Sequence, residues 1–233
     1  MEGYLYFYYG YGVGIKKQDS NRFPRKFKLS MHSPKQWTLF LDRDGVINQR
    51  KVGGYIRTWS EFFFLEGALS AIAKLNKYFA ITIVVTNQQG VAKGIMTENS
   101  LIEIHQKMLK TAREKGAQIN RVYYCTKHQS ENPICRKPNT GMGHSAKRDF
   151  PQIQFKQAVM VGDSPSDIQF GKNLGMKTVF LTTRRDIETQ VCTETLKQAD
   201  LVLSSLAELK KARHLSQLLA RDFINRGVKP TNL

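Results

Sequence analysis

Cysteine and long apolar runs are both scarce in this sequence. It holds three cysteines among 233 residues, Cys125, Cys135 and Cys192, too few and too unevenly spaced for a disulfide framework. We therefore expect reduced thiols, which fit a cytoplasmic protein. No run of eighteen apolar residues occurs, so we expect no membrane-spanning helix.

Acidic residues are few as well. The sequence has 19 aspartates and glutamates and 36 lysines and arginines, which gives a net charge of +17. Such a charge favours anionic partners: phosphorylated metabolites, nucleic acid or an acidic membrane surface. The basic residues form no long block, so dispersed, solvated charge is the simpler interpretation. With 41% apolar residues the composition is that of a globular protein, and the length suits one large domain with tails.

The first 36 residues differ from the rest. They contain five of the nine tyrosines and a basic stretch without periodicity. An arm that binds a membrane surface or nucleic acid is one interpretation; a poorly ordered extension is the simpler one, and we favour it. The sequence leaves open whether translation starts at Met1 or Met31. We expect three parts: the extension 1–36, a domain over 37–207, and a C-terminal helix with a basic tail over 208–233.

From Trp37 onward, strand and helix patterns alternate. Short apolar runs predict strands at 37–42, 80–87, 120–125, 177–182 and 199–204, and the stretch 157–175 reads as strand, loop and helix. Helical spacing predicts helices at 66–79, 97–116 and 206–219. Continuous apolar strands separated by helices favour a parallel sheet covered on both faces. We therefore predict an α/β fold, a Rossmann-like three-layer sandwich with a central parallel sheet.

Polar side chains follow three of these strands, and a fourth group lies in the loop after 120–125. Ligands gather at the carboxyl ends of parallel strands, so all four groups should meet at one sheet edge. The candidate residues are Asp42, Asp44, Thr86, Lys137, Asp163 and Asp167. Carboxylates this close need a cation, and hard oxygen ligands suit Mg²⁺. A lysine and a hydroxyl beside them predict a site that handles a phosphoryl group.

The stretches "DRDGVIN", "VVTN", "RKP" and "VGDSPSD" resemble the four motifs of the haloacid dehalogenase-like phosphatases, in the same order, over residues 37–207. The resemblance implies a phosphoric monoester hydrolase. Asp42 would be the nucleophile that forms an aspartyl-phosphate, and Asp44 the general acid and base. Thr86 would hydrogen-bond a phosphoryl oxygen, and Lys137 would balance the charge of the transition state.

The same resemblance implies a Mg²⁺ site made by Asp42, Asp163 and Asp44, the last through its backbone carbonyl. Asp167 would orient the catalytic lysine. Arg43, between the two motif aspartates, should point away from the site, and Gly45 should allow a tight turn out of the strand.

Members of this superfamily gain specificity from cap domains inserted between the motifs. Here the gaps 43–85 and 87–136 are consumed by one predicted helix and one predicted strand each, which predicts a capless fold with an open site. The loop 50–59, with its two adjacent glycines, is the expected specificity loop.

Finer features, notably "TNQQGVAKG" and "CRKPNTGM", are similar to the branch of D-glycero-D-manno-heptose 1,7-bisphosphate 7-phosphatases and histidinol-phosphate phosphatases, and more to the heptose enzymes. This implies Asn87, Gln88 and Gln89 near the substrate, and Arg136 on its distal phosphate or hydroxyls. We expect a monomer acting on a small phosphorylated sugar, without membrane or nucleic-acid partner. Histidinol-phosphate phosphatase and nucleic-acid 3′-phosphatase remain alternatives, the latter because of the positive charge.

The resemblance also raises the question of zinc. This branch usually carries Cys-x-His followed by Cys-x-Cys just before the RKP motif. The chain keeps Cys125 and Cys135, but Lys127 stands where the histidine belongs and His128 comes one position late. Structural zinc needs four N or S ligands, so we expect no intact Zn²⁺ site and two reduced cysteines packed in the loop.

Overall fold

The protein is described by a computed structural model that covers residues 36–182, 190–211, 214–215 and 218–219. The extension 1–35, with the question of the start at Met1 or Met31, lies outside the described residues, as does the tail from 220 onward. Among the described residues, no helix combines the length and the apolar character needed to cross a lipid bilayer.

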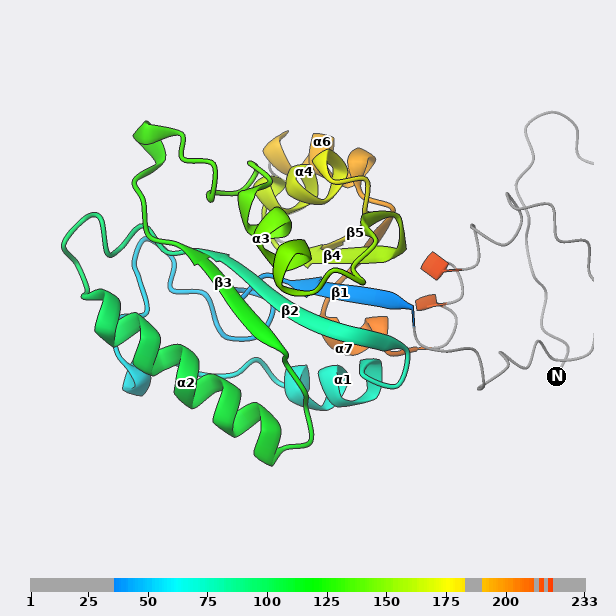
Figure 1. Cartoon of the computed structure of the whole chain (residues 1–233), viewed down its shortest axis with the longest axis horizontal. Coiled ribbons are helices and arrows are strands. Elements are labelled where there is room, and N and C mark those ends of the chain that lie inside the picture. Colours follow the sequence, from blue (N-terminus) through cyan, green and yellow to red (C-terminus); the bar gives the residue numbers. More distant parts are fainter. Residues whose placement is uncertain (1–35, 183–189, 212–213, 216–217, 220–233) are drawn as a thin grey trace, which may run out of the picture. The chain divides into compact units, whose positions relative to one another are not determined.

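A six-stranded sheet forms the centre of the described fold (Figure 1). Its strands are β1 (Trp37–Leu41), β2 (Phe79–Asn87), β3 (Arg121–Cys125), β4 (Ala158–Gly162), β5 (Lys177–Leu181) and β6 (Leu201–Leu203). Their order is β3-β2-β1-β4-β5-β6, and every neighbouring pair is parallel. The predicted parallel α/β sheet is confirmed.

Helices cover both faces of this sheet. They are α1 (Ala68–Leu75), α2 (Glu98–Glu114), α3 (Gly141–Asp149), α4 (Pro165–Asn173), α6 (Gln190–Gln198) and α7 (Leu206–Leu209), with short 3-10 turns at Trp59–Glu61, Gln129–Glu131 and Phe155–Gln157. Figure 1 shows α1, α2 and α7 on one side of the sheet and α3, α4 and α6 on the other. The result is the predicted three-layer sandwich.

The strands are buried on both faces because their side chains alternate between two apolar clusters. In β1, Leu39 and Leu41 pack into the cluster shared with α1, α2 and α7. Phe40 points the other way, into the cluster shared with α3 and α4. This is why the strands read as unbroken apolar runs rather than as alternating ones.

Most predicted helices are present, with shorter bounds. The helix predicted over 97–116 is α2, whose Thr97 accepts a hydrogen bond from the Ser100 N–H at 3.0 Å and caps its start. The helix predicted over 206–219 is interrupted: α7 ends at Leu209 and a turn follows at Lys210, while residues 214, 215, 218 and 219 are again helical. Two helices were not predicted, α3 and α6; the α3 sequence opens on Gly141 and buries little beyond Met142 and Ala146.

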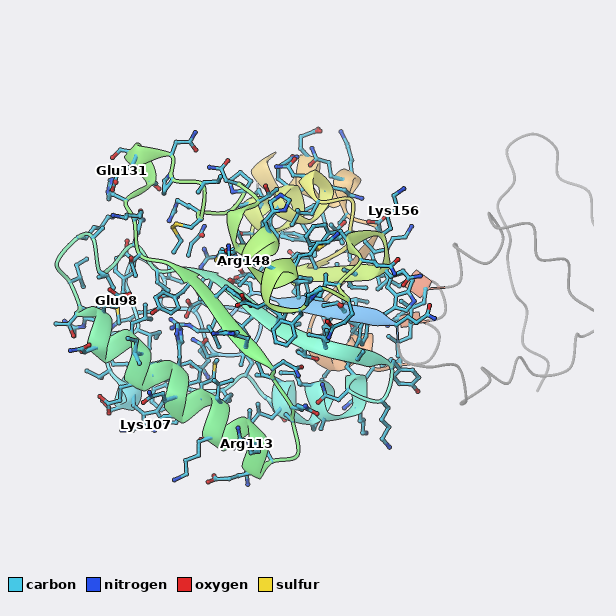
Figure 2. The ribbon with its side chains drawn as sticks, viewed as in Figure 1. Glu98, Lys107, Arg113, Glu131, Arg148 and Lys156 are labelled. Carbon is cyan, nitrogen blue, oxygen red and sulfur yellow. A yellow bond between two sulfur atoms is a disulfide. The ribbon has the colours of Figure 1, made fainter. Side chains whose placement is uncertain are left out.

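No inserted domain interrupts the motifs over 36–182, where the structure is continuous: α1 lies between β1 and β2, and α2 between β2 and β3. This agrees with the capless fold. Exposed charges of both signs lie on different elements, including Glu98 and Lys107 on α2 and Arg148 on α3 (Figure 2). These exposed charges fit dispersed charge, which stays a prediction for the whole chain.

Replacing Phe40 by alanine tests the central layer of the core. Phe40 is fully buried, so Phe40→Ala removes a complete apolar side chain and leaves a cavity. The free energy of unfolding should fall by about 3–5 kcal/mol, measured by urea denaturation. Phe63, which is 57% exposed, is the matched control, and Phe63→Ala should change the free energy by less than about 0.5 kcal/mol. Equal losses in the two variants would contradict this account of the core.

Candidate active site

The nine predicted site residues line one cavity of about 480 Å³ at the carboxyl ends of the strands. They are Asp42, Asp44, Thr86, Asn87, Gln88, Gln89, Arg136, Lys137 and Asp163. Asp42 follows β1, Thr86 lies near the end of β2, and Asp163 follows β4. Because these strands are parallel neighbours, residues far apart in the sequence meet at one edge.

A buried lysine joins two of the acids. The Lys137 Nζ lies 2.6 Å from Asp42 Oδ1 and 2.6 Å from Asp167 Oδ1, and it donates to the Val85 carbonyl at 2.7 Å. Burial lowers the pKa of the Lys137 ammonium group, but the charges of Asp167 and Asp42 outweigh burial and raise that pKa above its usual value. Lys137 therefore stays charged, and Asp167 is in place to orient it, as predicted.

Asp42, Asp163 and Asp167 form an acidic triad in which one oxygen from each residue lies within 4.8 Å of the others. Burial raises the pKa of the Asp42 carboxyl to about 7, although Lys137 opposes this shift. Burial and the charges of Asp42 and Asp167 raise the pKa of Asp163 to about 8. The triad thus holds more negative charge than Lys137 offsets, and its hard oxygen donors fit a divalent cation such as Mg²⁺.

Two glycines let these carboxylates come so close. Gly45 has a φ of +87°, and a β-carbon there would overlap the Asp163 carboxylate. A β-carbon at Gly162 would overlap Asp167 in the same way. Gly45 therefore serves the predicted turn and also makes room for Asp163.

The Asp44 carboxylate lies apart from the triad and has its own partners. Arg43 Nη2 donates to both of its oxygens, at 3.1 and 3.0 Å, and the amides of Asn48 and Gln88 each donate at 2.9 Å. Burial raises the pKa of Asp44, but the Arg43 charge and these hydrogen bonds hold it below its usual range. The prediction that Arg43 points away is wrong, because its guanidinium group turns back to pair with the adjacent carboxylate.

Gln88 connects two predicted catalytic residues. Its Nε2 donates to Asp44 Oδ2 and, at 2.8 Å, to Thr86 Oγ1. Thr86 accepts this bond, so its own hydroxyl hydrogen is free to point into the cavity. Gln88 is 2% exposed, and its amide is engaged within the protein rather than held out toward a substrate.

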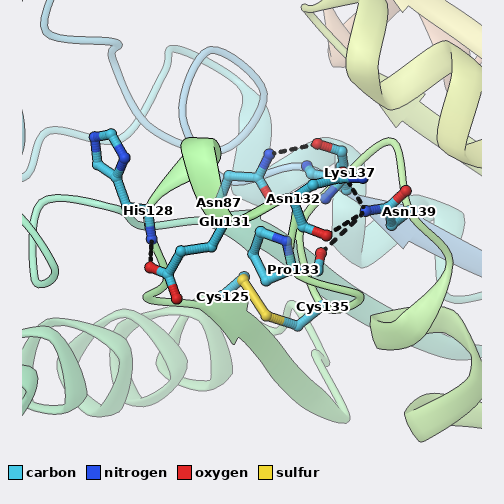
Figure 3. Close-up of a disulfide and its surroundings, with 9 residues drawn as sticks. All are labelled: Asn87, Cys125, His128, Glu131, Asn132, Pro133, Cys135, Lys137 and Asn139. Carbon is cyan, nitrogen blue, oxygen red and sulfur yellow. Dashed lines mark hydrogen bonds between the residues drawn. A yellow bond between two sulfur atoms is a disulfide. The ribbon is translucent and has the colours of Figure 1, made fainter.

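Asn87 fixes the loop that carries the lysine. Its Nδ2 donates to the Lys137 carbonyl at 3.1 Å, and its Oδ1 accepts from the Lys137 N–H at 3.0 Å (Figure 3). These two bonds hold the lysine backbone against the end of β2. The geometry gives Asn87 a positioning role beside the predicted contact with substrate.

The mouth of the cavity is basic. Arg50, Lys51, Lys93 and Arg136 line it beside Tyr55. The loop 50–59, predicted to shape specificity, contributes several of these lining residues. Arg50 Nη1 donates to Asp163 Oδ2 at 3.1 Å. Within the described part of the chain, the buried Nη1 of Arg136 has no hydrogen-bond partner, so a donor is available to an anion there.

Cys125 and Cys135 form a disulfide, with their Cα atoms 5.4 Å apart (Figure 3). The expectation of two reduced cysteines is therefore wrong. The fold brings the end of β3 close to the loop before Arg136, so that two cysteines ten positions apart in the sequence form a bond. His128 instead caps the turn Gln129–Glu131, and Figure 3 shows its ring away from the sulfur atoms. The three candidate zinc ligands, all among the described residues, are therefore not gathered into a metal site.

Sequence reasoning missed several residues of the site. Arg43 is completely buried, and His105 on α2 contacts it. Asn48 holds Asp44, and Tyr55 accepts a hydrogen bond from Gln89 Nε2 at 3.1 Å. Asn48 is the last residue of the motif "DRDGVIN", and Tyr55 lies in the loop 50–59, so both could have been suspected. Nothing in the spacing of the sequence pointed to His105.

Known proteins resemble this chain over most of the described fold. The family model described as HAD-hydrolase-like matches residues 134–209. The D-glycero-alpha-D-manno-heptose-1,7-bisphosphate 7-phosphatase of Mycobacterium bovis is 40% identical over 139 residues, which are 60% of this chain and 73% of that protein. The D-glycero-beta-D-manno-heptose-1,7-bisphosphate 7-phosphatase of Photorhabdus laumondii is 32% identical over 75% of this chain and 93% of its own length.

Two solved structures of phosphatases are similar in fold to this chain. The D,D-heptose 1,7-bisphosphate phosphatase of B. bronchiseptica, complexed with magnesium and phosphate, matches with a TM-score of 0.62 and 26% identity, covering 82% of this chain and 99% of that chain. A putative HAD-like phosphatase of Mesorhizobium loti matches with a TM-score of 0.63 and 26% identity, over 78% and 88% of the two chains.

The raised pKa values of the triad predict a pH-dependent response to Mg²⁺. Asp42 and Asp163 have pKa values of about 7 and about 8 in the folded protein against an ordinary 3.8. Without divalent cations, the folded state keeps protons that the unfolded chain releases, so stability falls as pH rises from about 4 to about 8. Mg²⁺ binds the ionised carboxylates and opposes that loss.

In thermal unfolding, the rise in Tm caused by added MgCl₂ should therefore be several °C larger at pH 8 than at pH 5. Asp163→Asn should remove most of this rise, while Asp149→Asn, an exposed acid outside the cavity, should leave it unchanged. A rise that is equal at both pH values, or larger at pH 5, would contradict the assignment of the triad.

Proposed function

The chain belongs to the haloacid dehalogenase-like phosphatases, in the family of the heptose-1,7-bisphosphate phosphatases, and from this membership we propose that it hydrolyses the 7-phosphate of a D-glycero-D-manno-heptose 1,7-bisphosphate. The observation that carries the proposal is the division of the acids at the sheet edge. Asp42 shares the Lys137 ammonium group with Asp167, whereas Asp44 is held separately by Arg43.

The first step uses Asp42 as the nucleophile. An Asp42 oxygen attacks phosphorus, the bond from phosphorus to the sugar oxygen breaks, and an aspartyl-phosphate forms. The sugar oxygen leaves as an alcohol with the proton of Asp44. Burial raises the pKa of Asp44, the Arg43 charge and the hydrogen bonds to the carboxylate outweigh burial in the free protein, and the negative charge of a bound phosphate adds to the effect of burial, so that Asp44 enters this step protonated. Lys137 stays charged beside the nucleophile, and the free hydroxyl hydrogen of Thr86 donates to a phosphoryl oxygen.

The second step returns the enzyme to its starting state. Asp44, now ionised, takes a proton from water, the water oxygen attacks phosphorus, and the bond to Asp42 breaks to release inorganic phosphate. When bound at Asp42, Asp163 and the Asp44 backbone carbonyl, Mg²⁺ supplies positive charge that offsets the phosphoryl oxygens. The geometry and donor type of Asp42 and Asp163 suit this ion.

The basic mouth supports a substrate with a second phosphate. Arg136 has a buried donor without a partner among the described residues, and a planar guanidinium group suits a phosphate better than a point charge does. Arg50, Lys51 and Lys93 line the same part of the cavity. The proposal covers both anomers, because relatives named for the alpha and for the beta sugar both match this chain.

Substitution of the two motif aspartates tests the chemistry. Asp42→Asn should abolish turnover, with kcat lower by at least about 1,000-fold, because the amide is a poor nucleophile. Asp44→Asn should lower kcat about 100- to 10,000-fold, because the proton transfers are lost. Phosphate release from the heptose bisphosphate measures both. Asp149→Asn is the matched control, and near-normal activity in either motif variant would refute the mechanism.

Substitution of Arg136 tests the substrate. Arg136→Gln should raise KM for the heptose bisphosphate about 10- to 100-fold and change KM for p-nitrophenyl phosphate less than about threefold, because the latter has no second phosphate. Arg148→Gln, at an exposed arginine of α3 outside the cavity, is the control. A higher kcat/KM of the unaltered protein on histidinol phosphate or a 3′-phosphorylated oligonucleotide would overturn the proposed substrate.

A further inference from the structure

Arg43 is a charged residue with no exposed surface, at 0% accessibility. Its Nη2 donates to both oxygens of Asp44, and its Nη1 lies 3.1 Å from His105 Nε2. The guanidinium carbon also lies 5.9 Å from the centroid of the Phe62 ring. The planar group is thus held between an aspartate that follows β1 and a histidine on α2.

His105 has the properties of a neutral acceptor. It is 5% exposed, and burial, followed by the Arg43 charge, lowers its pKa to about 3. An arginine only donates hydrogen bonds, so His105 Nε2 accepts from Arg43 and the ring hydrogen lies on Nδ1. The ring also contacts Tyr124, with centroids 5.3 Å apart, which restricts its orientation.

We propose that His105, acting through Arg43, is a positioning residue that fixes the direction of the Asp44 carboxylate for proton transfer to the leaving oxygen; this rests on the role of Asp44 in the proposed function. His105 does not line the cavity and reaches the reaction only through the guanidinium group. Without its acceptor, Arg43 Nη1 would be a buried donor without a partner, which is unfavourable. The guanidinium group would then shift, and Asp44 would lose its two-oxygen contact.

The contact between His105 and Arg43 does more than fill space in the protein interior. Burying a guanidinium group is costly, and an apolar side chain at this place would be the simpler way to fill the space. Asn48 and Gln88 donate to the other sides of the same carboxylate, so three residues hold Asp44 from different directions. A general acid must keep its proton aimed at one atom, and small misplacements reduce the rate strongly.

The test compares His105→Leu, which removes the acceptor at similar volume, with His105→Gln, whose amide oxygen can take the place of Nε2. We measure kcat/KM on glycerol 3-phosphate and on aryl phosphates from phenyl to p-nitrophenyl phosphate. This constant reports the step that forms the aspartyl-phosphate. An alkyl alcohol needs the Asp44 proton to leave, whereas p-nitrophenolate leaves without it.

His105→Leu should lower kcat/KM about 30-fold on glycerol 3-phosphate and at most about threefold on p-nitrophenyl phosphate. His105→Gln should stay within about threefold of the unaltered protein on every substrate. The control is Ile104→Val, a neighbouring buried residue of α2, which should lower Tm without any dependence on the leaving group.

Arg43→Lys provides a second variant if His105→Leu is unfolded at the assay temperature. A lysine keeps the charge but cannot span His105 and both oxygens of Asp44, so the same dependence on the leaving group is expected. A loss that is uniform across the series, or no loss at all, would overturn the inference and leave the proposed function intact. An unaltered protein that releases phosphate neither from the heptose bisphosphate nor from any of these phosphates would instead refute the proposed function.

Discussion

The Lys137 ammonium group holds two buried carboxylates at once, and the rest of the active site depends on this contact. Asp42 and Asp167 each lie 2.6 Å from it, in a region almost closed to water. Three acids could not share such a place without a cation, because burial and mutual repulsion oppose ionisation. Lys137 offsets part of that charge, and the remainder makes the edge of the sheet attractive to a divalent cation.

A second buried cation, Arg43, gives Asp44 surroundings that differ from those of Asp42. It pairs with Asp44, which is not part of the triad, so two aspartates two positions apart have different environments. The pKa of Asp42 is raised by burial, whereas that of Asp44 is held low by Arg43 and its hydrogen bonds. These directions belong to the site without substrate or cation, and the reaction needs the opposite protonation of each group. Mg²⁺ would favour the ionised Asp42, and the negative charge of a bound phosphate would raise the pKa of Asp44, so that Asp44 can carry a proton.

The outer part of the cavity is suited to binding the substrate, whereas the inner part holds the residues that carry out the reaction. The loop 50–59 and the residues around Arg136 bring basic groups to this part of the cavity, and no cap domain is inserted within residues 36–182. The Cys125–Cys135 disulfide ties the end of β3 to the residue just before Arg136. The disulfide thereby closes the loop that presents Arg136 and Lys137. It uses two of the cysteines that the family resemblance had suggested as zinc ligands.

The amino-acid pattern was enough to predict the parallel sheet, the strand ends and the group of acids, because these follow from local apolar runs, the polar residues after them and parallel geometry. It did not determine where side chains turn after a strand ends. Arg43 returns to Asp44, His105 reaches it from α2, and two cysteines meet across a loop, because charge pairing and packing act between residues distant in the chain. The helices α3 and α6 were not predicted, and α7 ends earlier than predicted, for a related reason: these helices depend on packing against the sheet more than on local propensity. Tertiary structure alone decided these features, since contacts in space, not spacing in sequence, set their energies.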